Sequence, residues 1–285
     1  MSGVTDETGW VLWAATVGLE SSIGARVEAA HAARCSRLSL AAGDVASLEA
    51  EGTPAAELGR LLRGEGLEVV MDPVTGWYGG APMPGRFGEV GFDDELRMAE
   101  ELGVVSMTAI GPFTPGEVPV DDLPDRFGAF CDRAADFGAQ VQYEFMPVSA
   151  MADVTSVWDV VRAAGRRNGG IMFDTLHFFR SGGDFAALAQ VPGDRILAVQ
   201  VSDAPADVQG SLGEDTFHRR LPGDGDLDLA GALAAIDRVG ALRWVGAEVL
   251  SPETAAMPPA EAGRVATDRV RALVARVQSG RAADE

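Results

Sequence analysis

The sequence predicts an α/β protein, a single-domain (β/α)8 TIM barrel, and three observations lead to that prediction. Short apolar segments alternate with segments of 3.6-residue periodicity that end at glycine, a pattern typical of parallel strands covered by helices. The alternation repeats eight times within 285 residues, which is an ordinary length for a barrel of this kind. The first expected strand lacks a following G-x-G-x-x-G, so a dinucleotide-binding open sheet is not favoured.

Each expected strand is a short apolar run, rich in valine, leucine or aromatic residues. In chain order these runs are 10–18, 37–40, 67–71, 104–110, 141–145, 171–173, 196–201 and 244–249. Each expected helix follows its strand and carries one apolar face. The helices are 21–33, 54–63, 92–102, 123–137, 154–164, 185–189, 229–239 and 260–277.

Two long irregular stretches interrupt this alternation, residues 73–91 and 203–228, after the third and seventh strands. We expect both on the C-terminal face, where barrels build their active sites. The chain lacks a proline- or serine-rich linker, so residues 1–285 are expected to form one domain.

Composition excludes several classes of function. The formal net charge is −20, and all 23 basic residues are arginine. Without lysine the chain cannot form a Schiff base or a Walker-type phosphate loop, and its acidity argues against nucleic-acid binding. We expect a cytoplasmic protein without a membrane partner, because neither a run of about 20 apolar residues nor a signal-type start is present. Cys35 and Cys131 are expected to be buried thiols.

Four polar residues end consecutive apolar strands: Glu144, Asp174, Gln200 and Glu248, separated by 30, 26 and 48 residues. They therefore project toward one rim of the predicted barrel. A single acid at a strand end is more often a helix N-cap, but three acids converging on one cleft would repel each other unless a cation lay between them. Oxygen-rich ligation suits Mn²⁺, with Mg²⁺ or Co²⁺ as alternatives, better than a structural zinc. His177, three residues after Asp174, is expected beside the cleft.

The motifs around these residues resemble those of the xylose isomerase-like barrel superfamily of sugar (phosphate) isomerases and epimerases. They are YEF at Glu144, FDTLH from Asp174 to His177, VQVSDAP with the later HRRLPGDGDLD, and AEV at Glu248. Relatives include ketose 3-epimerases, hydroxypyruvate isomerase, inosose dehydratase and barrel endonucleases. The three histidines of this chain cannot supply the zinc cluster of the endonucleases.

The resemblance implies one divalent metal ion held by Glu144, Asp174, position 200 and Glu248. Gln200 stands where most relatives have histidine, although hydroxypyruvate isomerase is similar in using glutamine there. His218 remains an alternative ligand to Gln200.

The implied activity is that of a metal-dependent isomerase or epimerase (EC 5.-) of a sugar, keto-sugar or polyol-like substrate. Proton abstraction next to a metal-bound carbonyl would give an enediolate. Glu144 and Glu248 would transfer the proton, while His177 and Arg219 would orient substrate oxygens.

An aromatic rim is expected at the mouth of the cleft, and the glycine-rich segment 79–91 is a candidate lid. The rim candidates are Trp13, Trp77, Tyr78, Phe113 and Phe178, of which Trp77 and Phe113 are expected to bind substrate.

Two alternatives stay open. The same site could serve a lyase (EC 4.-), which dehydrates an inosose or eliminates a group from an oxidised glycoside. The chain could also be a non-catalytic barrel subunit. The expected partner is a small molecule, and a phosphorylated one is not favoured. The sequence leaves the substrate, the metal and any homo-oligomer open.

Overall fold

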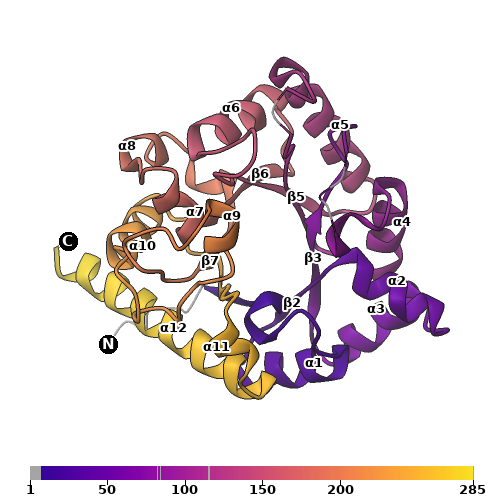
Figure 1. Cartoon of the computed structure of the whole chain (residues 1–285), viewed down its shortest axis with the longest axis horizontal. Coiled ribbons are helices and arrows are strands. Elements are labelled where there is room, and N and C mark those ends of the chain that lie inside the picture. The colour runs from indigo at the N-terminus through magenta and orange to yellow at the C-terminus, as the bar shows by residue number, and fades with distance from the viewer. Residues whose placement is uncertain (1–7, 82, 84, 115, 285) are drawn as a thin grey trace.

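A closed barrel of parallel strands forms the centre of the molecule, and helices surround it (Figure 1). The computed structural model describes residues 8–81, 83, 85–114 and 116–284. The strands follow one another around the barrel in chain order, which confirms the predicted (β/α)8 fold. They are β1 Gly9–Leu12, β2 Arg37–Leu40, β3 Glu68–Val74, β4 Ser106–Ala109, β5 Gln140–Glu144, β6 Gly169–Asp174, β7 Ile196–Val201 and β8 Trp244–Ala247.

Long amphipathic helices cover the outside of the barrel, their buried residues facing the strands. They are α1 Ile23–Ala32, α3 Ala55–Gly64, α4 Phe92–Leu102, α5 Leu123–Ala135, α6 Val154–Ala164, α10 Leu229–Arg238 and α12 Pro259–Asp284. Shorter helices lie in the connections: α2 Ala42–Ala50, α7 Thr175–Arg180, α8 Phe185–Leu188, α9 Leu212–Asp215 and α11 Pro252–Ala255. The helix α12 packs against α1, so the last helix closes the ring beside the first (Figure 1).

The first apolar run is shorter as a strand than the sequence suggested. Only Gly9–Leu12 is extended, and Ala14–Val17 forms a 3-10 helix over the top of the barrel. The helices α2, α7, α9 and α11 are not among those predicted from the sequence. Their hydrophobic patterns are too short to separate from loop, and α9 and α11 have only four residues each.

A small apolar cluster fills the inside of the barrel and becomes the floor of the site. Its members are Val11, Trp13, Val70, Met172 and Ala198. Residues two apart in a strand point to the same side. The side chains that follow Val70, Met172 and Ala198 at that spacing therefore also point inward, one layer higher. They are Asp72, Asp174 and Gln200.

A glycine on β8 makes room for this floor. Gly246 pairs with Gln200 across the β7–β8 ladder. A Cβ atom at Gly246 would lie 2.1 Å from the Val11 carbonyl oxygen and 2.8 Å from Nε1 of Trp13. The indole of Trp13 can thus fill the barrel directly below the polar layer only because position 246 lacks a side chain.

Candidate active site

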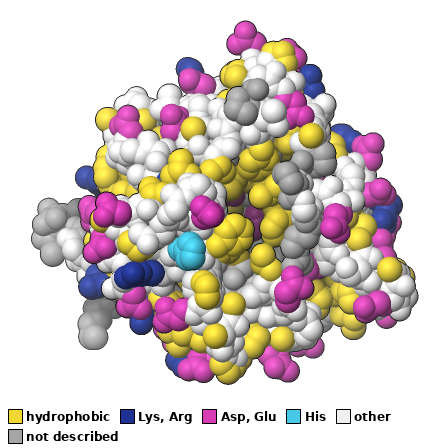
Figure 2. All heavy atoms as spheres, viewed as in Figure 1, with side chains coloured by type: hydrophobic (Ala, Val, Ile, Leu, Met, Phe, Trp, Pro, Cys, Tyr) yellow, Lys and Arg dark blue, Asp and Glu magenta, His cyan; other side chains and the backbone are white. Residues whose placement is uncertain are grey.

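A cavity of about 730 Å³, which includes open solvent, lies above this floor. Figure 2 shows the face on which it opens: the surface is hollowed at its centre and hydrophobic side chains gather around the hollow. Met83 and Phe87 contribute from the β3–α4 loop, while Thr216, Phe217 and Arg219 contribute from the β7–α10 loop. Carboxylates of Asp72, Glu144 and Glu248 also line it.

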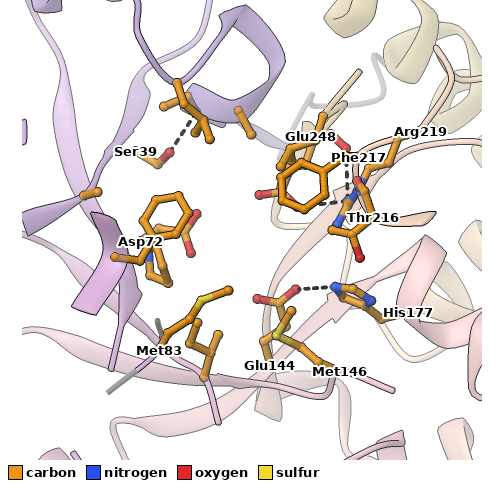
Figure 3. Close-up of a pocket in the computed structure, with 18 of the residues that line it drawn as sticks. Ser39, Asp72, Met83, Glu144, Met146, His177, Thr216, Phe217, Arg219 and Glu248 are labelled. Carbon is orange, nitrogen blue, oxygen red and sulfur yellow. Dashed lines mark hydrogen bonds and ion pairs between the residues drawn. The ribbon is translucent and has the colours of Figure 1, made fainter. Parts of the chain in front are cut away.

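Glu144 and His177 form one side of the site (Figure 3). Glu144 ends β5, and its Oε1 lies 3.5 Å from Nε2 of His177 on α7. Burial raises the pKa of Glu144 well above its usual range, and the nearby Glu248 and Asp174 raise it further. Burial also lowers the pKa of His177 to about 4, so this imidazole is neutral at physiological pH.

Asp174 has two structural partners as well as its place in the site. Its Oδ1 accepts a hydrogen bond of 2.9 Å from the backbone N–H of His177 and so caps α7. Its Oδ2 lies 2.6 Å from Nη1 of Arg219. Helix capping and metal binding are therefore not exclusive for Asp174, because the same carboxylate caps α7 and lies close to Glu144. Burial favours a higher pKa for Asp174, yet Arg219 and His177 outweigh it and lower the pKa.

Arg219 connects the carboxylate at the end of β6, Asp174, with the carboxylate that follows β8, Glu248. Besides Asp174, its Nη1 lies 2.9 Å from Oε2 of Glu248 and donates to the Glu248 carbonyl at 3.1 Å. The guanidinium is almost completely buried and stays protonated, because Asp174 and Glu248 more than offset its loss of hydration. Burial raises the pKa of Glu248 to about 8, even though Arg219 opposes that rise.

Gln200 supplies a buried oxygen without a partner among the residues that the structure describes. Its Nε2 donates to Oε1 of Glu248 at 3.0 Å, and its Oε1 is buried without a hydrogen-bond partner among the described residues. A buried carbonyl oxygen normally has a partner. A hard divalent cation, which prefers carboxylate and amide oxygens, would provide one.

A metal ion therefore fits these side chains. Ligand atoms of Glu144, Asp174 and His177 lie within 4.8 Å of one another. Gln200 and Glu248 extend this group with further oxygen donors. The set Glu144, Asp174, Gln200 and Glu248 thus offers oxygen donors throughout, with His177 as a nitrogen donor at its edge.

Asp72 lines the same cavity from β3, although its position in the sequence did not single it out as a site residue. Burial raises the pKa of this carboxyl to about 6, against the effects of a hydrogen bond from Thr108 and the charge of Arg219. The signal was available, because Asp72 directly follows the apolar run 67–71. The expected strand ended at residue 71, whereas β3 continues to Val74.

The expected aromatic rim is largely absent from the cavity. Four of its five candidates are buried in the core: Trp13, Trp77, Tyr78 and Phe178. The Trp77 indole donates to the Ile110 carbonyl and packs edge-on against Tyr143, so it does not reach the cavity. Phe113 is partly buried in the loop after β4 and is not among the lining residues.

Phe87 and Phe217 are the aromatic side chains that line the cavity within the described part of the chain. Figure 3 shows the Phe217 ring at the edge of the cavity, near Arg219 and Thr216. His218, the alternative ligand to Gln200, is exposed in the same loop and lies outside the group of ligand atoms.

Comparison with known proteins agrees with this architecture. A sequence model of the family described as xylose isomerase-like TIM barrel matches residues 28–272. A 3-dehydroshikimate dehydratase of Pseudomonas aeruginosa is 29% identical over 250 residues, covering 86% of this chain but only 38% of the dehydratase. An inosose isomerase of Bacillus velezensis is 25% identical over 191 residues, covering 65% of this chain and 68% of the isomerase.

Solved structures share the fold over nearly the whole chain. The IolI protein, crystallised with a bound zinc atom, superposes with a TM-score of 0.80 at 18% identity, covering 94% of this chain and 99% of IolI. L-ribulose 3-epimerase superposes with a TM-score of 0.72 at 13% identity and covers 98% of each chain. The structure contains no helix long and apolar enough to cross a membrane within the residues that it describes.

Proposed function

Because the chain belongs to the xylose isomerase-like TIM barrel family, we propose that it is a divalent-metal-dependent isomerase or epimerase of an uncharged keto-sugar or keto-polyol. One observation carries this proposal: two carboxylates, Glu144 and Glu248, enter one cavity from β5 and from the end of β8 (Figure 3). Isomerisation and epimerisation each need one group that removes a proton and one that returns it. The curated relatives of this chain, an inosose isomerase among them, are enzymes.

The side chains have distinct parts in this proposal. One glutamate removes the proton from the carbon next to a carbonyl, and the other returns a proton to the opposite face or to the next carbon. Glu144, Asp174, Gln200 and Glu248 would hold the metal ion, which would stabilise negative charge on the carbonyl oxygen. Arg219 keeps Asp174 and Glu248 in place through its two short contacts.

The charges of the lining support an uncharged substrate. Among the described residues that line the cavity, Arg219 and His177 are the ones that can carry positive charge. The guanidinium of Arg219 is already paired with two carboxylates, and burial keeps His177 neutral. A phosphate or carboxylate on the substrate would therefore meet mainly acidic groups.

A lyase is the second candidate, because a 3-dehydroshikimate dehydratase matches over 86% of this chain. The same proton abstraction would then expel a β-hydroxyl group. The two reactions leave different products. A lyase generates an enone absorbance, whereas an isomerase or epimerase incorporates solvent deuterium into an otherwise intact sugar.

The test begins with elemental analysis after purification with added Mn²⁺. We expect about one divalent ion per chain, and conversion of at least one member of a panel of ketoses, inososes and 3-dehydroshikimate, followed by NMR in D₂O. Glu144→Gln and Glu248→Gln should each reduce turnover by about 100-fold or more. Glu253→Gln, at an exposed position five residues after Glu248, is the matched control.

Three outcomes would count against this function. A metal content far below one ion per chain would remove the metal site. Undiminished turnover in both variants would remove the proton-transfer roles. Normal ligand binding without conversion of any compound would support the non-catalytic alternative.

A further inference from the structure

Asp72 is a carboxylate of the cavity for which the proposed reaction has no use. It lies on β3 and faces Glu144 and Arg219 across the open centre (Figure 3). Its carboxylate is partly exposed to the cavity, whereas Asp174 is fully buried. Asp72 is therefore available to a molecule that enters the cavity.

Two buried side chains, Thr108 and Gln142, form a chain of hydrogen bonds that ends at Asp72. The amide Nε2 of Gln142 donates to Oγ1 of Thr108 at 3.0 Å, so Thr108 already accepts one hydrogen bond. The hydroxyl proton of Thr108 is then left to donate to Asp72, with which it is hydrogen-bonded. Gln142 and Thr108 together therefore hold one side of the Asp72 carboxylate as a hydrogen-bond acceptor.

Asp72 differs from its acidic neighbours in its partners. Asp174 and Glu248 are each paired with Arg219, and Glu144 lies against His177. Within the described part of the chain, no salt bridge involves Asp72. A carboxylate has about four acceptor positions, and those not taken by Thr108 are open to donors in the cavity.

The neighbouring side chains indicate the kind of donor. Pro73, Ile110 and Phe87 line the cavity as apolar groups on the strand and loop beside Asp72. The Asp72 carboxylate beside these apolar side chains suits a polyol ring, whose hydroxyl groups can donate hydrogen bonds and whose C–H groups can pack against the apolar side chains. A metal ion is a less suitable ligand for Asp72, because the other oxygen ligands of the site lie on or directly after β5–β8, on the other side of the cavity.

We propose that Asp72 determines specificity: its carboxylate accepts a hydrogen bond from a substrate hydroxyl remote from the carbon that exchanges its proton. The site thereby selects polyhydroxylated substrates over analogues that lack this hydroxyl. Thr108 is a positioning residue that acts through Asp72. The inference rests on the proposed function, since it assumes a keto-polyol in the cavity.

The experiment compares Asp72→Ala and Asp72→Asn with the wild-type protein on an inosose and on analogues that each lack one hydroxyl. For the complete substrate, we expect kcat/KM to fall about 10- to 100-fold in Asp72→Ala. For the deoxy analogue that lacks the hydroxyl bound by Asp72, the kcat/KM values of wild type and Asp72→Ala should differ by less than about threefold. Thr108→Val should show the same selectivity with a smaller loss, and Asp207→Asn at an exposed position should show none. The metal content should stay the same in all variants.

The outcomes separate this inference from the proposed function. Equal losses for every analogue, or a loss of metal in Asp72→Asn, would overturn the role in specificity while leaving the isomerase intact. Calorimetric binding of the unreactive polyol inositol provides the second measurement. If Asp72→Ala weakens that binding but the wild type converts nothing, the reaction is wrong and the recognition role stands. A wild type that neither binds nor converts any polyol overturns both.

Discussion

At the scale of single residues, Gln200 is the side chain whose environment points most directly to a missing partner. Its Oε1 is buried and has no hydrogen-bond partner in the described part of the chain, while its Nε2 donates to Glu248. Gln200→Leu removes the oxygen and roughly keeps the volume. We predict that the apparent Kd for Mn²⁺ rises about 10-fold or more, because one oxygen donor is lost. Thermal melting at increasing Mn²⁺ concentration measures this.

A glutamine at the other end of β5 is the matched control for that substitution. Gln140 begins β5, far from the cavity, so Gln140→Leu should leave the response to Mn²⁺ unchanged. If Gln200→Leu binds Mn²⁺ as tightly as the wild type, Gln200 is not a ligand.

Glu95 is a buried carboxyl outside the site, and it allows a prediction about how the stability of the fold depends on pH. It lies in the first turn of α4, about 1% exposed, and accepts the backbone N–H of Thr75. Burial raises its pKa to about 8, so the folded chain holds this proton more tightly than the unfolded chain. The resulting stability is complete below about pH 4 and is lost as the pH rises through 8.

Glu95→Gln keeps the acceptor and removes the titration. We therefore expect its melting temperature to match the wild type near pH 5 and to exceed it by several degrees near pH 9. Glu100→Gln, exposed on the same helix, should follow the wild type at both values. A constant difference between Glu95→Gln and wild type across this range would show that Glu95 does not titrate with folding.

The sequence indicated the acidic residues of the site but not its aromatic ones. Glu144, Asp174 and Glu248 were recognisable because a charge at the end of an apolar strand is costly unless it has a partner. Asp72 obeys the same rule, but it lies one residue beyond the expected end of its strand at Met71. The sequence could not show that Trp77 belongs to the core and Phe217 to the cavity, because an aromatic ring packs equally well in either place.

At the scale of elements, the β7–α10 loop is ordered by one buried carboxylate. Asp203 accepts backbone N–H groups of Ala204, Gly223 and Leu227 at 2.9, 3.0 and 3.1 Å. A Cβ atom at Gly225 would lie 2.3 Å from Oδ1 of Asp203, so the turn also depends on that glycine. The loop carries Arg219 and Phe217, and its shape therefore sets two walls of the cavity.

We predict that Asp203→Ala lowers the free energy of unfolding by about 2–4 kcal/mol, because three hydrogen bonds to a charged group are lost. It should also lower kcat/KM by about 10-fold or more, since Arg219 loses its fixed place. Urea unfolding and steady-state kinetics measure the two effects. Asp207→Ala, exposed in the same loop, is the control. Unchanged kinetics with reduced stability would show that the loop's order does not matter to the site.

The strands could be predicted better than the short connections. An apolar run bounded by glycine leaves little choice, and the expected ranges 37–40 and 196–201 coincide with β2 and β7. The helix α7 begins immediately after β6, with Asp174 as its cap. A helix of six residues is too short to show a clear hydrophobic period, so the cap at Asp174 is the main local feature that marks its start.

At the scale of the whole molecule, the site concentrates acids in a chain whose net charge is already −20. Asp72, Glu144 and Glu248 line one cavity, and Asp174 lies buried close to Glu144 and Arg219. Among the described residues, Arg219 is the arginine that lines this cavity. Protons relieve this repulsion when metal is absent, which is why burial and mutual charge raise the pKa of Glu144 and bring that of Glu248 to about 8. Metal ions and protons therefore compete for the same oxygens.

This competition fixes the sign of the pH dependence of metal binding. In the metal-free protein, Glu248 holds a proton below about pH 8, and burial also favours the protonated form of Glu144 by raising its pKa. A metal ion must displace these protons, so its apparent affinity should rise with pH, by up to about tenfold per unit for each proton released.

We expect calorimetric titrations with Mn²⁺ between pH 6 and 8.5, in buffers of different ionisation enthalpy, to report between one and two protons released. In Glu144→Gln the count should fall and the dependence should flatten. Saturation at 100 times Kd should add about 2.7 kcal/mol to stability. Affinity that is constant over this range would mean that the carboxylates are already ionised and that Arg219 alone balances their charge.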